Sequence, residues 1–173
     1  MNLVRKKKSW PRFFIQGFLI IGLLYGLWWW FISHYVIVIS QGKPCLPGRI
    51  YLVDHQTQKF DRGDLIMFST DDRTGPYYPA GTKFVKKVFG LPGDRVEIDA
   101  QGQLQINGQD YHFESALEPQ VVDLLGRETS DFALDMVIPP GSYFVMGTLP
   151  DSFDSRYWGL VEQKQVIGKA SVL

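Results

Sequence analysis

The stretch "KFVKKVFGLPGDRVEID", residues 83–99, combines two β-strand patterns with a turn between them. Apolar and β-branched residues predict strands at 83–90 and 94–99, and the Gly, Pro and Asp between them favour a turn. The same pattern recurs on both sides of this stretch, and it predicts further strands at 34–40, 49–55, 63–69, 102–108, 141–147 and 165–172. The sequence therefore predicts a mainly β domain built from short strands.

Two adjacent lysines lie inside the first of these strands. Because side chains alternate between the two faces of a strand, Lys86 shares a face with Phe84, whereas Lys87 shares the other face with Val85. One of the two lysines must therefore point inward, and alternation alone does not say which. A buried lysine can act as a general base, because burial disfavours its charged form. The alternative is a sheet edge whose lysines discourage pairing with another chain.

The segment "FFIQGFLIIGLLYGLWWWFIS", residues 13–33, carries no charge and is long enough to cross a membrane. As a helix, its 21 residues would measure about 31 Å, which is close to the thickness of the hydrocarbon core. A cleaved secretion signal is the weaker alternative, because the apolar run is too long and no small-x-small site follows it. The five basic residues that precede this segment are Arg5, Lys6, Lys7, Lys8 and Arg12.

Basic residues before a membrane span favour an N-terminus in the cytoplasm. We therefore expect residues 1–12 to be a cytoplasmic basic segment and residues 13–33 to be a single-pass anchor in a bacterial inner membrane. Residues 34–173 are then a periplasmic domain. Membrane lipid is an expected partner, and the basic cluster is an orientation signal rather than a nucleic-acid site.

The sequence gives no support for a metal ion or a nucleotide cofactor. Its three histidines, His34, His55 and His112, show no His-x-x-x-His spacing, and there is no second cysteine, so no metal is expected. No Gly-x-Gly-x-x-Gly or Walker pattern is present, so no cofactor is expected. Residues 111–140 are less regular than the rest and could form an insertion, either with a helical turn or as a loose excursion.

The only cysteine, Cys45, lies in "KPCLPGRIY", residues 43–51, where Pro and Gly predict a tight connection rather than a strand or helix. Conditions outside the inner membrane are oxidising and normally pair cysteines. A single cysteine cannot pair within its own chain, so it is an inert buried residue, an intermolecular link or a reactive thiol.

The stretch "DSFDSRYWG", residues 151–159, places a carboxylate and a guanidinium two residues apart. In a strand Asp154 and Arg156 would share one face, and Ser152 would join them if the extended run begins that early. Three such groups on one face could orient a neighbouring buried charge. The alternative is an Asp-Ser turn that leads into a strand with an ordinary surface ion pair, which contributes little to stability.

Taken in order along the chain, these segments resemble the type I signal peptidases, the serine-lysine membrane proteases. The apolar segment and the cysteine loop are followed by "RGDLIMF", "FVKKVFGLPGDRV", "INGQ", "IPPGSYFVMG", "DSFDSRYWG" and "VIGKA". The resemblance implies an antiparallel β fold held at the membrane surface. It also implies that Lys86 is the general base and that Ser152, Asp154 and Arg156 are the supporting residues of the last segment.

The chain departs from the family pattern in two places, at the nucleophile and at the start of the last segment. Where the family has Ser-x-Ser-Met-x-Pro, this chain has Lys43-Pro44-Cys45-Leu46-Pro47, so that Cys45 occupies the nucleophile position and the earlier hydroxyl is absent. The resemblance leaves the backbone N–H of Cys45 as one oxyanion donor, with Lys43 as the second. In addition, "GTLPDSFDSR" replaces the usual Gly-Asp-Asn-Arg-Asp start of the last segment. The short domain, the x-Leu-Pro-Gly-x-Ile-Tyr pattern and the Pro-Asp-Ser-Phe-Asp run resemble the TraF-like branch, which processes conjugative pilins.

The leading hypothesis is therefore an anchored endopeptidase in which Cys45 attacks an exported pre-protein, such as a prepilin, and Lys86 is the general base. A cysteine acyl-enzyme is a thioester, so the enzyme could also join the new ends and make a cyclic product. One alternative is a Cys-His protease that uses His55 or His112. The other is an inactive assembly or binding factor that keeps the fold.

Overall fold

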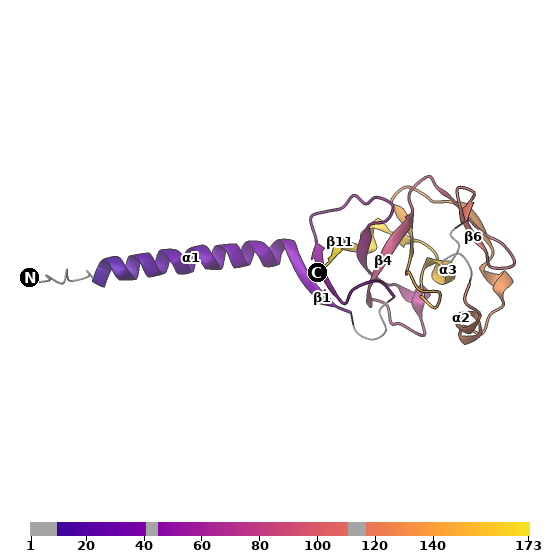
Figure 1. Cartoon of the computed structure of the whole chain (residues 1–173), viewed down its shortest axis with the longest axis horizontal. Helices are drawn as coiled ribbons and strands as arrows, with labels where there is room; N and C mark the ends of the chain where they lie inside the picture. The colour runs from indigo at the N-terminus through magenta and orange to yellow at the C-terminus, as the bar shows by residue number, and fades with distance from the viewer. Residues whose placement is uncertain (1–9, 41–44, 111–116) are drawn as a thin grey trace, which may run out of the picture. The chain divides into compact units, whose positions relative to one another are not determined.

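The computed structural model describes residues 10–40, 45–110 and 117–173, and the chain divides into two compact units at Tyr35 (Figure 1). In the first unit, helix α1 (Trp10–His34) has no buried residue, and its most apolar window has a mean hydropathy of 1.7. In the described part of the chain it is the one helix long and apolar enough to cross a membrane. Its crossing and its orientation stay predictions.

The second unit, Val36–Leu173, contains two antiparallel sheets. The larger sheet has the order β1-β2-β11-β3-β4-β9-β10, and its strands are β1 (Tyr35–Ile39), β2 (Ile50–Asp54), β3 (Leu65–Ser69), β4 (Lys83–Gly90), β9 (Ser142–Met146), β10 (Val161–Glu162) and β11 (Val166–Val172). The smaller sheet has the order β7-β6-β5-β8, and its strands are β5 (Arg95–Ile98), β6 (Leu104–Ile106), β7 (Gln109–Asp110) and β8 (Leu134–Val137).

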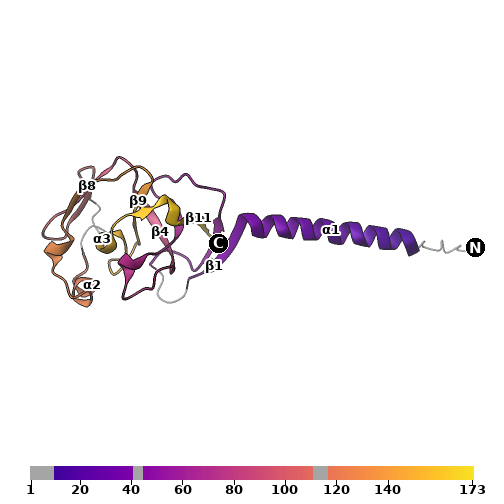
Figure 2. The same ribbon diagram turned by 180° about the vertical axis from the view of Figure 1, so that it is seen from behind.

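Short helices complete the second unit. They are η1 (Asp72–Thr74), α2 (Pro119–Leu124), η2 (Thr129–Phe132), α3 (Ser155–Trp158) and η3 (Gln163–Gln165). In both Figures 1 and 2, β1 and β11 lie at one side of this unit and the small sheet with α2 lies at the other. The mainly β prediction is confirmed, and each of the eight predicted strands overlaps a strand of the structure.

The described part of the irregular segment, residues 117–140, contains α2, η2 and β8. Strand β8 pairs with β5, with Met136 opposite Val96, so this segment completes the small sheet rather than forming a loose excursion. Residues 111–116, which include His112, lie outside the described residues.

A large core fills the space between the two sheets, and a smaller core lies under the cysteine loop. The most deeply buried residues of the large core include Ile66, Phe68, Val88, Val96, Ile106 and Phe144. The small core consists of Leu46, Tyr51, Val53, Met67 and Ala170. Leu46 therefore ties the chain next to Cys45 to the sheet below it.

One carboxylate holds the turn between β4 and β5. Asp94 accepts hydrogen bonds from the Leu91 N–H (2.6 Å), the Asn107 amide (2.7 Å) and the Arg62 guanidinium (2.8 Å). Burial alone would raise the pKa of Asp94, but these hydrogen bonds and the Arg62 charge outweigh burial and lower the pKa below its usual value. The ionised carboxylate therefore stabilises the turn that the sequence predicts.

Replacing Asp94 by Asn should lower the free energy of unfolding at neutral pH by about 1–2 kcal/mol, because charge-assisted hydrogen bonds are lost. The pKa of Asp94 is lower in the folded than in the unfolded chain. Its contribution is therefore present above the unfolded pKa of about 4 and is lost as the pH falls through the folded pKa. The measurement is urea unfolding of the detergent-solubilised protein from neutral to acid pH. A difference that persists undiminished at about pH 2 would contradict this account.

Candidate active site

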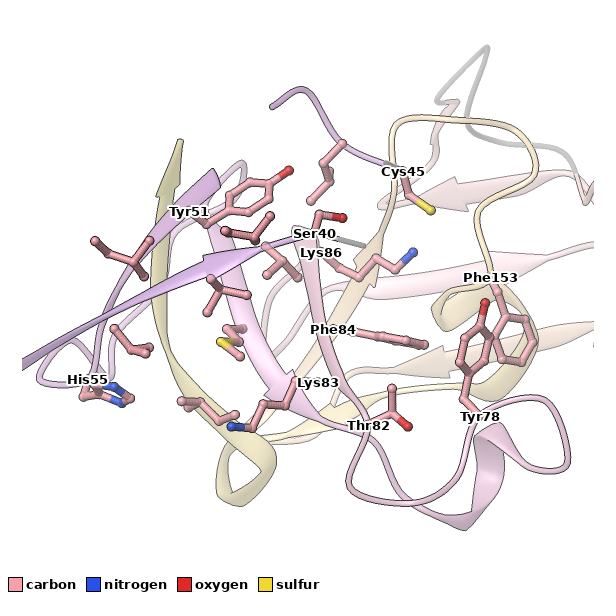
Figure 3. Close-up of a pocket in the computed structure, with 18 of the residues that line it drawn as sticks. Ser40, Cys45, Tyr51, His55, Tyr78, Thr82, Lys83, Phe84, Lys86 and Phe153 are labelled. Carbon is pink, nitrogen blue, oxygen red and sulfur yellow. The ribbon is translucent and has the colours of Figure 1, made fainter. Parts of the chain in front are cut away.

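A groove with a volume of about 890 Å³ opens in the second unit (Figure 3). Its walls come from β1, from the first half of β4, from the cysteine loop and from the loop before α3. The polar or charged residues that line it include Ser40, Cys45, His55, Lys83, Lys86 and Asp151. The groove therefore brings together two of the residues singled out in the sequence, Cys45 and Lys86.

Of the two adjacent lysines, Lys86 is the one that points inward, with 4% of its surface exposed. Strand β4 places it opposite Ile66 of β3, and its Nζ donates a hydrogen bond of 2.6 Å to Ser152 Oγ. Lys87 lies on the other face, where its Nζ is 5.2 Å from the centre of the Phe89 ring. The pairing of β4 with β3 therefore selects the lysine that alternation alone could not.

The three supporting residues come together, but not on the strand face that the sequence predicted. Asp154 is the N-cap of α3 and accepts a hydrogen bond from the Arg156 backbone N–H, because an aspartate caps the free N–H groups of a helix start. The prediction of a strand here is wrong. The predicted pairing of Asp154 with Arg156 is still present, because the helix cap brings the Arg156 side chain back to Asp154. The guanidinium donates to the two carboxylate oxygens at 2.8 and 2.9 Å.

This ion pair is fully buried, and it fixes the chain around Ser152. Both side chains have 0% exposure, and the Arg156 guanidinium also donates to the Ser152 carbonyl oxygen at 3.2 Å. Asp154 accepts a further hydrogen bond from the Gly147 N–H at 3.0 Å. The hydroxyl that contacts Lys86 is thus held by a buried network.

Two residues that the sequence analysis assigned no role hold the cysteine loop. The carbonyl oxygen of Cys45 accepts hydrogen bonds from the Thr148 N–H (2.8 Å) and the Thr148 hydroxyl (3.1 Å). A Cβ at Gly147 would overlap the Ser152 hydroxyl and come within 3.0 Å of the Cys45 carbonyl oxygen, so only glycine fits. The backbone of Cys45 and the hydroxyl that binds Lys86 are therefore close neighbours. In the sequence, the glycine of "VMGTLP" is the one feature that could have indicated this close approach of the two segments.

Tyr51 holds the other side of the same loop. Its hydroxyl donates to the carbonyl oxygens of Gly48 (3.0 Å) and Pro47 (3.2 Å), and its side chain is buried. Burial raises the pKa of Tyr51, and the charge of an ionised Cys45 raises it further. Tyr51 therefore remains a neutral hydrogen-bond donor, and it lies within electrostatic range of the cysteine.

The other predicted site residues lie elsewhere. Figure 3 shows His55 at the end of the groove away from Cys45, so the two side chains are not neighbours there. Lys43, the expected second oxyanion donor, and His112 are outside the described residues. Within residues 10–40, 45–110 and 117–173, no group of three or more His, Cys, Asp or Glu side chains could hold a metal ion.

Comparison with known proteins places this chain, with its groove and buried lysine, among the peptidases. Residues 10–173 match the family described as "Signal peptidase, peptidase S26". The chain is 31% identical over 166 residues to signal peptidase I of Bacillus caldolyticus, which covers 82% of this chain and 86% of the relative. It is 34% identical over 145 residues to signal peptidase I S of Bacillus subtilis (strain 168), which covers 79% and 73%.

A crystal structure of a signal peptidase I from Enterococcus faecalis V583 is 30% identical, with a TM-score of 0.39 over 65% of this chain and 97% of that one. On the match of residues 10–173 and the Bacillus relatives, the chain belongs to the signal peptidase family, peptidase S26, and is an endopeptidase of the signal peptidase I type. The family resemblance drawn from the sequence is confirmed. The TraF-like branch and the role of the cysteine stay proposals.

Proposed function

We propose that Cys45 is the nucleophile of this peptidase and that Lys86 is its general base. The main observation that supports this proposal is the position of Lys86. Its side chain is buried, its amine donates a hydrogen bond to Ser152 Oγ, and it lines the same groove as Cys45. Figure 3 shows the Cys45 sulfur and the Lys86 nitrogen directed into the same part of this groove. A thiol and a buried amine placed in this way form a nucleophile–base pair.

In the proposed reaction, the neutral amine of Lys86 takes the proton of the Cys45 thiol while the sulfur attacks the scissile carbonyl carbon. The C–N bond then breaks, and Lys86 returns the proton to the leaving amine. The product is a thioester on Cys45, which water hydrolyses with Lys86 again as the base. The Cys45 N–H and Lys43 would donate hydrogen bonds to the oxyanion.

Ser152, Asp154 and Arg156 support this pair without touching the substrate. Ser152 fixes the Lys86 amine, and the buried Asp154–Arg156 pair fixes Ser152 through its carbonyl oxygen. Such packing and hydrogen bonding hold a catalytic group in its productive orientation.

The groove suits an extended peptide. Strand β3 pairs with Lys83–Lys87, but β9 pairs only with Lys87, Val88 and Gly90 among the described residues. The first half of β4 therefore has one edge without a strand partner in the described chain. Such an edge can bind a substrate as an added strand. With α1 as an anchor whose N-terminus is cytoplasmic, the substrate is an exported pre-protein cleaved at the outer face of the inner membrane.

The narrower substrate class that we propose is a conjugative prepilin. It is supported by the Pro-Asp-Ser-Phe-Asp run and by the Leu-Pro-Gly-x-Ile-Tyr pattern, in which Tyr51 and Leu46 fix the cysteine loop. A thioester on Cys45 reacts with amines more readily, relative to water, than a serine ester does. An N-terminus held nearby would reach an effective molarity on the order of 10⁵ M and close the chain head to tail.

The test is intact mass spectrometry of the full-length protein in lipid vesicles with a membrane-anchored pre-protein and with a prepilin. We expect an acyl adduct on Cys45, absent from Cys45→Ala, and a pilin product one water lighter than the linear mature chain. Cleavage by Cys45→Ala at the parental rate would reject the nucleophile. Binding without adduct or cleavage would indicate an inactive binding factor. Linear product from both the parental protein and Cys45→Ser would reject ring closure.

A further inference from the structure

One wall of the groove is aromatic and is formed by Phe84, Tyr78 and Phe153. Figure 3 shows the three rings gathered beside the Lys86 amine, on the side away from His55. The Tyr78 ring packs edge to face on Phe84, with 4.9 Å between the ring centres, and is stacked on Phe153 at 5.8 Å. The Lys86 Nζ lies 5.6 Å from the centre of the Phe84 ring. This aromatic wall therefore begins at the proposed general base.

A carboxylate lies next to the aromatic wall. Ser152 is fully buried and accepts the hydrogen bond from Lys86, whereas its two neighbours in the chain, Asp151 and Phe153, line the groove. Asp151 is exposed, and among the described residues it is the acidic side chain that lines the groove. Since adjacent Cα atoms are about 3.8 Å apart, Asp151 lies close to the hydroxyl that holds the Lys86 amine. A negative charge and aromatic faces thus border the proposed catalytic pair.

A carboxylate beside aromatic rings is suited to an ammonium group. The carboxylate attracts the positive charge, and an aromatic face attracts a cation that lies within about 6 Å of the ring centre. A phosphate or carboxylate group would instead be repelled by Asp151. A metal ion is not favoured either, because hard cations bind through several oxygen ligands and Asp151 is the acidic residue that lines the groove in the described chain. The chemistry therefore favours a protonated amine.

An amine is also the second substrate of the proposed ring closure. Its nitrogen must reach the thioester carbon on Cys45, and its proton must pass to Lys86. An amine held at Asp151 lies near Lys86, because Ser152 between them contacts Lys86, and Cys45 lines the same groove. A chain N-terminus has an ordinary pKa of about 8, against about 10.4 for a lysine side chain, so it loses a proton more readily near neutral pH. The site therefore suits an N-terminal amine.

We propose that Asp151 and the aromatic wall bind the N-terminal ammonium group of an acceptor chain and direct it to the thioester on Cys45. The inference rests on the proposed function and adds to it the residues that favour transfer over hydrolysis. The bound ammonium gives one proton to neutral Lys86, and its nitrogen attacks the thioester carbon. The C–N bond forms, the C–S bond breaks, and a second proton of the amine goes to the Cys45 sulfur. Lys86 then releases its proton to water.

The test measures how the thioester divides between transfer and hydrolysis. The full-length protein in lipid vesicles cleaves an anchored pre-protein at about pH 7 and low salt, with either glycinamide or hydroxylamine added. Glycinamide is mostly an ammonium at this pH, whereas hydroxylamine is a small uncharged nucleophile. Mass spectrometry gives the ratio of transferred to hydrolysed product. Because the ratio is taken within each variant, a change in the rate of thioester formation does not affect it.

In Asp151→Asn we expect the glycinamide ratio to fall about threefold, and in Asp151→Lys about tenfold, with the hydroxylamine ratio unchanged. Phe153→Leu keeps an apolar side chain but removes a ring face, so it should lower the glycinamide ratio selectively too. With a prepilin substrate, the cyclic fraction should fall in the same variants. The matched control is Asp123→Asn, an exposed carboxylate of α2 outside the groove lining, which should keep both parental ratios.

The outcomes separate this inference from the proposed function. A parental glycinamide ratio in Asp151→Asn and Asp151→Lys would overturn the inference, and so would an equal fall in the glycinamide and hydroxylamine ratios, which would indicate a structural role. Hydrolysis alone by the parental protein, with an acyl adduct on Cys45, would also overturn it and leave a peptidase. No acyl adduct on Cys45 under any condition would instead mean that the proposed function fails.

Discussion

Replacing Lys86 by alanine should abolish cleavage, with kcat/KM falling by about 10³-fold or more, because the thiol of Cys45 loses its proton acceptor and the leaving amine loses its proton donor. The effect should be on kcat rather than on substrate binding, since Lys86 acts on the reacting atoms. The measurement is single-turnover cleavage of an anchored pre-protein in lipid, which isolates the chemical step.

The neighbouring residue provides a matched control, because Lys87→Ala removes the same side chain from the other face of the same strand. It should keep most of the activity. Lys86→Met, which fills the same buried space, separates the loss of the amine from the loss of packing against Phe84 and Ser152. Parental rates in a folded Lys86→Met protein would show that another group is the base.

The strands that the sequence predicts are those with enough alternating or β-branched residues to be recognised locally. Three strands escaped prediction: β7 and β10 have two residues each, and β8 lies in the irregular segment after Tyr111. The order of the sheet was not predictable in the same way. Strand β11 lies between β2 and β3, and this pairing of distant segments depends on tertiary packing rather than on local pattern.

In the candidate site too, some features follow from local sequence pattern and others depend on tertiary packing. The buried position of one lysine follows from strand alternation, but only the register of β4 against β3 identifies it as Lys86. The hydrogen bonds from Thr148 to Cys45 join residues about 100 positions apart, and no spacing rule predicts them. Asp154 and Arg156 were paired for the wrong reason, since a strand and a helix cap both bring residues two apart together.

Replacing Arg156 by leucine should lower the free energy of unfolding by about 3–5 kcal/mol, because it leaves the buried carboxylate of Asp154 without its counter-charge. Urea unfolding of the detergent-solubilised protein measures this loss. Arg156→Lys should recover only part of it, since an ammonium cannot make both hydrogen bonds of the guanidinium. The rate of cleavage should fall as well, because Arg156 holds the Ser152 carbonyl oxygen and the Ser152 hydroxyl accepts the hydrogen bond from Lys86.

The chain contains its own control for this prediction, since Asp71 and Arg73 repeat the same arrangement at the start of η1. Asp71 is the N-cap, and the Arg73 guanidinium donates to both of its oxygens, at 3.0 and 2.7 Å. Both side chains are 42% exposed, so water can replace the lost partner, and Arg73→Leu should cost less than about 1 kcal/mol. Equal losses in the two variants would mean that burial does not determine the energy of the Asp154–Arg156 pair. A large loss for Arg156→Leu alone, reduced when Asp154→Asn is added, would show that the unpaired charge is its cause.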